Sequence, residues 1–117
     1  MQVFIEEPWL SKLREHCLVK PGSYEDYPWD QLAFKVAPSG KMFCSCSGAY
    51  PSITVKSTLD KQSALIQHPS IEVAAYVGRH GWVTVNIQSD DEFELACDLI
   101  DESYALVAPK RKAKGSP

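Results

Sequence analysis

The apolar positions along the chain change their period several times, and each period predicts one kind of element. Over residues 8–19 they recur at helical spacing, in a stripe that includes Leu13 and Cys17. The pair Pro21–Gly22 ends this predicted helix. Residues 20–31 are rich in turn-forming and aromatic residues, and we expect them to form a loop.

From residue 32 the period falls to two, which is typical of β-strands. The alternation predicts five strands, at residues 32–37, 42–47, 52–56, 71–77 and 82–88. A short helix is expected between the third and fourth strands, opened by Ser57 in a capping box with Asp60. The connections between the strands are short, which indicates antiparallel pairing.

A longer helix follows the last strand. Ser89 and Glu92 form a second capping box at its start. Its apolar side chains lie on one face: Phe93, Ala96, Cys97, Ile100, Tyr104 and Val107. Together these elements predict a single α+β domain of two layers over residues 1–109, followed by a basic, disordered tail at 110–117.

Sorting the predicted strand residues by parity separates two faces of the sheet. The wholly apolar set is expected to pack on the helices: Leu32, Phe34, Val36, Met42, Cys44, Cys46, Ile53, Val55, Val73, Ala75, Val77, Val83, Val85 and Ile87. The other set is expected to face away from the helices: Ala33, Lys35, Lys41, Phe43, Ser45, Ser52, Thr54, Lys56, Glu72, Ala74, Tyr76, Trp82, Thr84 and Asn86.

A sheet face that mixes lysines with aromatic rings has the chemistry to stack bases and hold phosphates. The predicted nucleic-acid contacts are Lys35, Lys41, Lys56, Arg79, His80 and Trp82, and the further candidate ligand or partner contacts are Trp29, Phe43 and Tyr76. Two alternatives stay open. In the first, the face binds a protein segment, because aromatic residues are enriched at interfaces. In the second, the face is only solvated, and its rings pack against each other across strands.

The charge of the chain is unevenly distributed. The formal net charge is −3, but residues 1–109 hold eight bases and 15 acids, a charge of −7, and residues 110–117 add four bases. The acids Asp90, Asp91 and Glu92 stand at the start of the last helix, where the helix dipole favours them. Nucleic-acid binding must therefore depend on a local basic patch. For the tail two interpretations stay open: it strengthens non-specific nucleic-acid binding, or it is a solubilising end.

Several classes of protein are not expected. The sequence shows no membrane-spanning segment and no secretory signal, so we expect a cytoplasmic protein whose four cysteines are free and mostly buried. The pair Cys44 and Cys46 lacks the spacing of common zinc motifs, and no glycine-rich phosphate loop is present. We therefore expect neither an enzyme nor a bound metal or cofactor.

Several short motifs occur together in order along the chain. They are Glu25–Trp29, Phe34–Val36, Lys41–Phe43, Val55–Lys56, Arg79–Val85 and Asp101–Val107. Their ordered sum resembles the MmcQ/YjbR family of small bacterial proteins. The resemblance implies an α-β-β-β-α-β-β-α fold of the CyaY-like type, related to the double-wing domain of a phage transcription factor.

By analogy with that domain, the resemblance implies DNA binding. A similar plan in secretion chaperones implies protein binding as the alternative. The positions that match the family and carry polar or aromatic chemistry are Trp29, Lys35, Lys41, Lys56, Arg79, His80 and Trp82.

Overall fold

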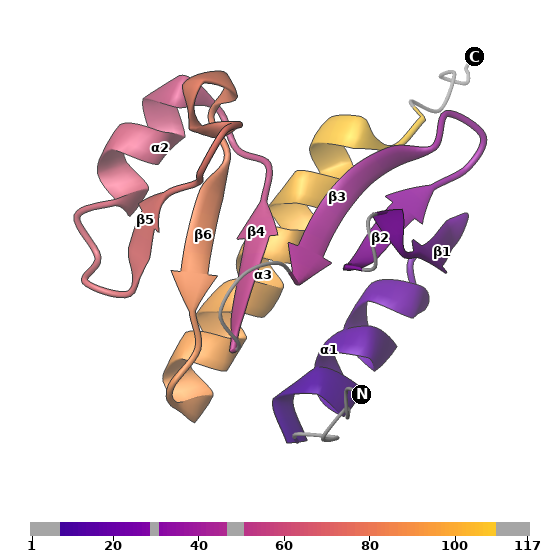
Figure 1. The fold of residues 1–117 in the computed structure, drawn as a ribbon, viewed down its shortest axis with the longest axis horizontal. Helices are drawn as coiled ribbons and strands as arrows, with labels where there is room; N and C mark the ends of the chain where they lie inside the picture. The colour runs from indigo at the N-terminus through magenta and orange to yellow at the C-terminus, as the bar shows by residue number, and fades with distance from the viewer. Residues whose placement is uncertain (1–7, 29–30, 47–50, 110–117) are drawn as a thin grey trace, which may run out of the picture.

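The structure is a computed structural model that describes residues 8–28, 31–46 and 51–109 (Figure 1). It confirms the α+β class. In chain order its elements are α1 (Pro8–Leu18), β1 (Ser23–Asp26), β2 (Leu32–Val36), β3 (Lys41–Cys46), β4 (Ser52–Val55), α2 (Leu59–Leu65), β5 (Ile71–Val73), the 3-10 turn η2 (Gly78–His80), β6 (Val83–Asn86) and α3 (Asp90–Val107). The candidate Trp29 and the predicted tail at 110–117 lie outside the described residues.

The sheet has six strands in the order β1-β2-β3-β4-β6-β5, and every neighbouring pair is antiparallel. The prediction of five strands was therefore wrong, because β1 lies inside the expected 20–31 loop. Its sequence, Ser-Tyr-Glu-Asp, has no alternation of apolar and polar residues. As an edge strand it pairs on one side only, so its side chains need not be buried.

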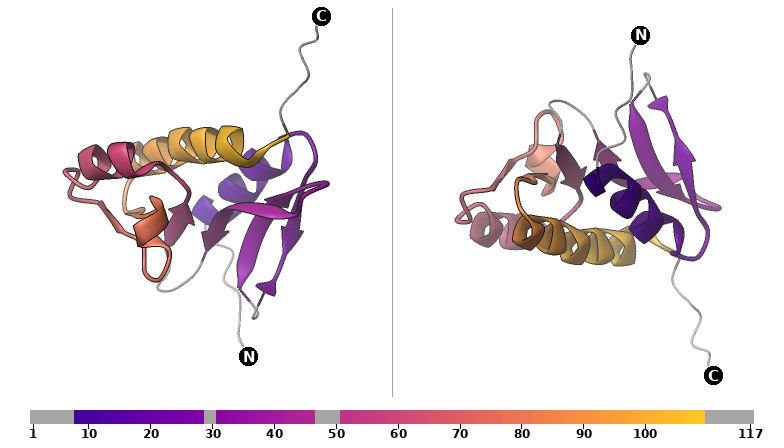
Figure 2. Two further views of the ribbon diagram at one scale, coloured as in Figure 1. Left: turned by 90° about the horizontal axis from the view of Figure 1, so that it is seen from above. Right: turned by 90° about the horizontal axis from the view of Figure 1, so that it is seen from below.

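The helices lie in one layer against one side of the sheet (Figure 2). The ring of Trp9 on α1 stacks on Phe93 of α3, with 5.4 Å between their centroids. Below these helices the strands contribute fully buried side chains, among them Phe34, Val55 and Val83. This core is the apolar face that the parity of the strands predicted, apart from the changes described next.

A β-bulge at Phe43 reverses the parity at the start of β3. Phe34 is paired with Cys44, but the next residue, Lys35, is paired with Met42, so Phe43 is the extra residue. Phe43 is fully buried, and its ring meets Tyr104 of α3 edge-on at 5.3 Å. The expectation that Phe43 faces away from the helices was therefore wrong, and Met42 takes a place on the other face, beside Lys35.

The last two strands are also shorter than predicted. The β5 strand ends at Val73 instead of residue 77, and the segment up to β6 is a chain of tight turns. Val73 is 49% exposed rather than part of the core. The helix α2 is capped by Thr58, whose hydroxyl accepts a hydrogen bond from the backbone N–H of Lys61, so the predicted cap at Ser57 was one residue early.

The four cysteines are free thiols, and Cys17 and Cys44 are buried while Cys46 and Cys97 are half-buried. Among the described residues, no helix combines the length and the apolar character that crossing a membrane requires.

Candidate nucleic-acid interface

The face of the sheet opposite the helices, called the open face here, is not basic across its middle. One row of paired residues crosses all six strands in the order Asp26, Ala33, Ser45, Thr54, Thr84 and Glu72. The hydroxyls of Thr54 and Thr84 bond to each other at 2.9 Å. This row is acidic at both ends and neutral between them, so it is a poor platform for phosphate.

Two of the residues predicted to bind nucleic acid on this face are not available to a ligand. The Lys35 ammonium donates a hydrogen bond of 2.7 Å to the Asp26 carboxylate. This hydrogen bond, reinforced by one from the backbone N–H of Tyr27, lowers the pKa of Asp26, while the pair raises the pKa of Lys35. Trp82 is only 9% exposed, so its ring is not available to stack a base.

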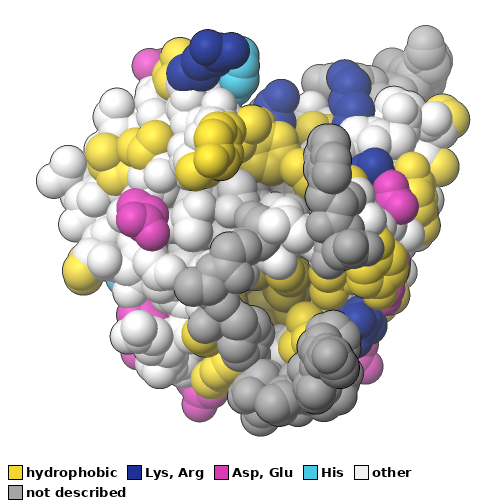
Figure 3. Space-filling model, in the orientation of Figure 1, with side chains coloured by type: hydrophobic (Ala, Val, Ile, Leu, Met, Phe, Trp, Pro, Cys, Tyr) yellow, Lys and Arg dark blue, Asp and Glu magenta, His cyan; other side chains and the backbone are white. Residues whose placement is uncertain are grey.

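The other predicted cations lie along one end of the sheet. Because the strands are antiparallel, the end of β4 lies beside the start of β6, and on its other side it is paired with Cys44, three residues after the start of β3. Lys41, Lys56 and the Arg79–His80 pair occupy this end, and we call these four residues the basic rim. Figure 3 shows Lys and Arg side chains near the upper edge of the open face, one of them beside a histidine.

The basic rim differs in its pairing from all the other described Lys and Arg residues except Lys12 of α1. Four bases elsewhere are each in an ion pair: Arg14 with Glu25, Lys20 with Asp101, Lys35 with Asp26 and Lys61 with Glu102. Within the described part of the chain, no carboxylate forms an ion pair with Lys41, Lys56 or Arg79. These three charges are therefore available to an anion from outside.

Helix α3 fixes the rim from behind through Ser103, which is fully buried. The Ser103 hydroxyl donates a hydrogen bond of 2.6 Å to the carbonyl of Phe43 and accepts one of 2.9 Å from the N–H of Lys56. It thus joins the start of β3 and the residue after β4 to the last turns of α3. Sequence reasoning missed Ser103, although it stands inside the Asp101–Val107 motif.

A strained turn precedes the arginine of the rim. Tyr76 has a φ of +66°, in the left-handed region that side chains other than glycine rarely adopt. The N–H of Val77 bonds to the carbonyl of Ala75 at 2.6 Å, which makes Tyr76 the centre of a γ-turn of the uncommon positive-φ form. Its side chain is 97% exposed.

A buried glutamine holds the next turn, η2. The Gln62 amide on α2 donates hydrogen bonds of 2.7 Å to the carbonyl of Gly78 and 2.9 Å to that of Trp82, on either side of Arg79 and His80. Gly81 closes the turn at a φ of +98°, and a Cβ there would lie 2.6 Å from the carbonyl oxygen of Ser57. The prediction of a simple two-strand hairpin missed Gln62, because a single polar residue in a short helix gives no sign of burial.

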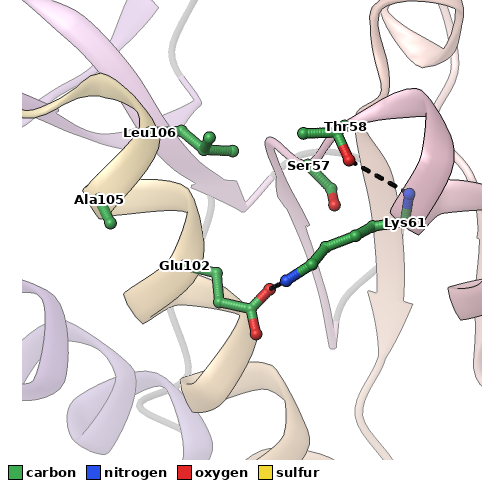
Figure 4. Close-up of a pocket in the computed structure, with 6 residues that line it drawn as sticks. All are labelled: Ser57, Thr58, Lys61, Glu102, Ala105 and Leu106. Carbon is green, nitrogen blue, oxygen red and sulfur yellow. Dashed lines mark hydrogen bonds and ion pairs between the residues drawn. The ribbon is translucent and has the colours of Figure 1, made fainter.

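A small cavity of about 230 Å³ lies behind the rim, between α2 and α3 (Figure 4). Six residues line it: Ser57, Thr58, Lys61, Glu102, Ala105 and Leu106. The Lys61 ammonium pairs with the Glu102 carboxylate at 3.0 Å, so these charges satisfy each other. The Ser57 hydroxyl is buried and, among the described residues, has no hydrogen-bond partner. Within the same residues, no three side chains of the metal-ligating types come together.

Comparison with known proteins places this geometry in a family. The model of the YjbR family matches residues 18–106. The crystal structure of the Deinococcus radiodurans protein DR2400, described as a DUF419 domain, is similar with a TM-score of 0.74 and 31% identity, over 94% of this chain and 88% of that one.

A Pseudomonas syringae protein shares the fold at a TM-score of 0.64 and 19% identity, over 82% of this chain and 96% of that one. None of the curated proteins matches the chain. The family match covers most of the chain and includes β1 to β6 and nearly all of α3, so the chain belongs to the YjbR family.

Proposed function

We propose that the protein binds nucleic acid without catalysing a reaction, and that the basic rim contacts the phosphate backbone. One observation carries the proposal. Lys41, Lys56 and Arg79 lie along one end of the sheet with no ion pair to any described carboxylate, while four of the five other described bases are paired with acids. Phosphate contacts depend on such available Lys and Arg side chains.

The distribution of charge supports a local interface on an acidic domain. The acids Asp90, Asp91 and Glu92 begin α3, whereas Ser103, near the other end of that helix, bonds to the rim. The chain leaves α3 after Val107, and residues 110–117 then carry four bases. The basic rim is thus separated from the acidic start of α3 by most of the length of that helix, which favours one orientation toward a polyanion.

The proposal predicts a salt-dependent affinity that the rim controls. The double variant Lys41→Ala with Arg79→Ala removes the two most exposed rim cations. We expect weaker binding to a fluorescein-labelled duplex at low salt, measured by anisotropy. The slope of log K against log salt should become shallower by about 0.9 for each phosphate that the variant no longer neutralises, or by roughly two in total.

A matched control removes the same charge elsewhere. The variant Lys12→Ala with Lys35→Ala has the same net charge, but it changes α1 and the open face instead of the rim. It should bind the duplex with nearly wild-type affinity, because the Lys35 ammonium is already paired with the Asp26 carboxylate. Equal losses in both variants would show that overall charge, and no defined surface, governs binding. Undetectable binding of wild-type protein to both duplex and single-stranded nucleic acid at low salt would refute the proposal.

A protein-binding role is the second candidate, favoured by exposed apolar side chains near the same end. Tyr76 is 97%, Leu59 56% and Val73 49% exposed, and exposed aromatic and aliphatic side chains often mark partner surfaces. Under this alternative, Leu59→Ser would abolish a stoichiometric complex that the Lys41→Ala/Arg79→Ala variant still forms. Loss in both variants, or in neither, would count against it.

A further inference from the structure

We infer that Tyr76 is a base-stacking residue and that the preferred ligand contains single-stranded nucleic acid. The inference rests on the proposed function and adds the class of ligand to it. A Tyr ring stacks on an unpaired base whatever the sequence, whereas the paired bases of a duplex offer no free face to a single side chain.

The first observation is that the backbone holds Tyr76 outward in a strained form. An exposed tyrosine gains little from burial, so nothing in the core compensates for a φ of +66° at this position. Strain of this kind is concentrated at ligand-binding and active sites, where the surrounding structure maintains it. The γ-turn therefore presents the ring to solvent at a small cost in stability.

The second observation is that the neighbouring turns fix the position of the ring relative to the rim. The N–H of His80 bonds to the carbonyl of Val77 at 3.0 Å, so η2 begins directly after the γ-turn. Gly78 fits closely against Val73, since a Cβ there would lie 2.2 Å from a Val73 methyl carbon. With Gln62 holding the other side of η2, Tyr76 and Arg79 belong to one constrained segment.

The third observation is the chemistry of that segment. Arg79 and His80 are exposed, and the Arg79 Nε donates toward the His80 Nε2 at 3.3 Å. Within four residues, Tyr76 to Arg79, the chain thus offers an aromatic face and a cation with no described carboxylate paired to it. One nucleotide of a flexible strand has the matching groups, a base and a phosphate. A phosphorylated or acidic protein segment has the charge but not the stacking base.

The test compares a single strand with a duplex of the same sequence. Tyr76→Ala should weaken binding of the labelled single strand by about tenfold or more, and Tyr76→Phe by less than about twofold, because the ring is what stacks. Duplex binding through the rim should change by less than about twofold in both variants. A 2-aminopurine in the strand should lose emission on binding to wild type and Tyr76→Phe but not to Tyr76→Ala.

Two controls keep the outcomes distinct. Tyr76→Gly, which adopts the positive φ without strain, should lose single-strand affinity as Tyr76→Ala does, so a folding defect is excluded as the cause. Tyr27→Ala removes a ring that is 52% exposed beside the edge strand β1 and should bind normally. Unchanged single-strand affinity in Tyr76→Ala would overturn the inference. It would not contradict the proposal that the basic rim binds phosphate in a salt-dependent way. If wild type binds neither form, the proposed function fails as well.

Discussion

Cys44, Cys46 and Cys97 differ in how strongly their surroundings favour the thiolate. The hydrogen bond from Cys44 is the main cause that lowers the pKa of Cys46. Burial acts in the opposite direction, and the positive charge of Arg14 lowers the pKa further. The same cluster raises the pKa of Cys44, first through its hydrogen bond to Cys17. Burial raises the pKa of Cys97 to about 11.

These directions predict an order of alkylation, because the thiolate is the reacting form. Cys46 and Cys97 are both half-buried. At mildly alkaline pH, iodoacetamide should modify Cys46 first and Cys97 more slowly, and Cys17 and Cys44 should react last because both are buried. Peptide mass spectrometry over time measures the order, and labelling in urea should remove it. Equal rates for Cys46 and Cys97 in the folded protein would contradict this account.

At the scale of the element, period-two alternation identified β2, β3, β4 and β6 and most of their core side chains. It failed where local geometry departs from a regular ladder. The bulge at Phe43 inserts one residue and reverses the parity of everything before it in β3, which a propensity for strand structure cannot reveal.

The candidate site was harder to predict than the fold for the same physical reason. The sequence identified Arg79, His80 and Tyr76 as residues of interest. It also predicted that Trp82 is exposed beside them on the open face, whereas the structure buries Trp82 almost completely. It also had no means of pairing Lys35 with Asp26, since β1 was assigned to a loop. Which cations are available depends on contacts between elements, and those become visible only in the folded chain.

The short helix α2 is predicted to act as the support of the η2 turn. Gln62→Leu keeps the size of a side chain that is only 9% exposed but removes both hydrogen bonds to the carbonyls of Gly78 and Trp82. Loss of these buried bonds should lower the free energy of unfolding by about 1–3 kcal/mol, measured with urea. It should also speed amide exchange in the turn, including the N–H of Gly81, which bonds to Gly78.

Gln67→Leu is the matched control on the same segment, because Gln67 is exposed and its amide makes only a long bond of 3.5 Å to the carbonyl of Ser63. That change should alter the free energy of unfolding by less than about 0.5 kcal/mol. Similar losses in the two variants would show that Gln62 has no special role.

At the scale of the whole molecule, three carboxylates connect parts of the chain that are distant in sequence. Asp26 joins the edge strand to Lys35 of β2. The hydrogen bond from the Ser70 hydroxyl, together with that from the N–H of Gln88, lowers the pKa of Glu92. Burial alone would raise the pKa of Asp101. Hydrogen bonds from His16 of α1 and from Lys20, just after α1, bring it below its ordinary value of 3.8.

All three shifts have the same sign, so their effects on stability add. A carboxyl group whose pKa is lower in the folded state stabilises the fold at any pH above its unfolded pKa. As the pH falls through the folded value, both states become protonated and the stabilisation is lost. The free energy of unfolding should therefore be insensitive to these groups near neutral pH and should decrease as the pH falls below about 4.5.

Urea unfolding from pH 7 to pH 3 measures this decrease, and Asp101→Asn isolates the link between α1 and α3. The variant should be less stable than wild type at pH 7, and the difference should shrink as the pH falls through the lowered pKa of Asp101, because the wild-type carboxyl group then becomes protonated too. The groups are partly exposed, so added salt should reduce the difference at pH 7. A difference that stays constant across the whole range would mean that Asp101 contributes by packing or by uncharged hydrogen bonds, and that its charge does not join the two helices.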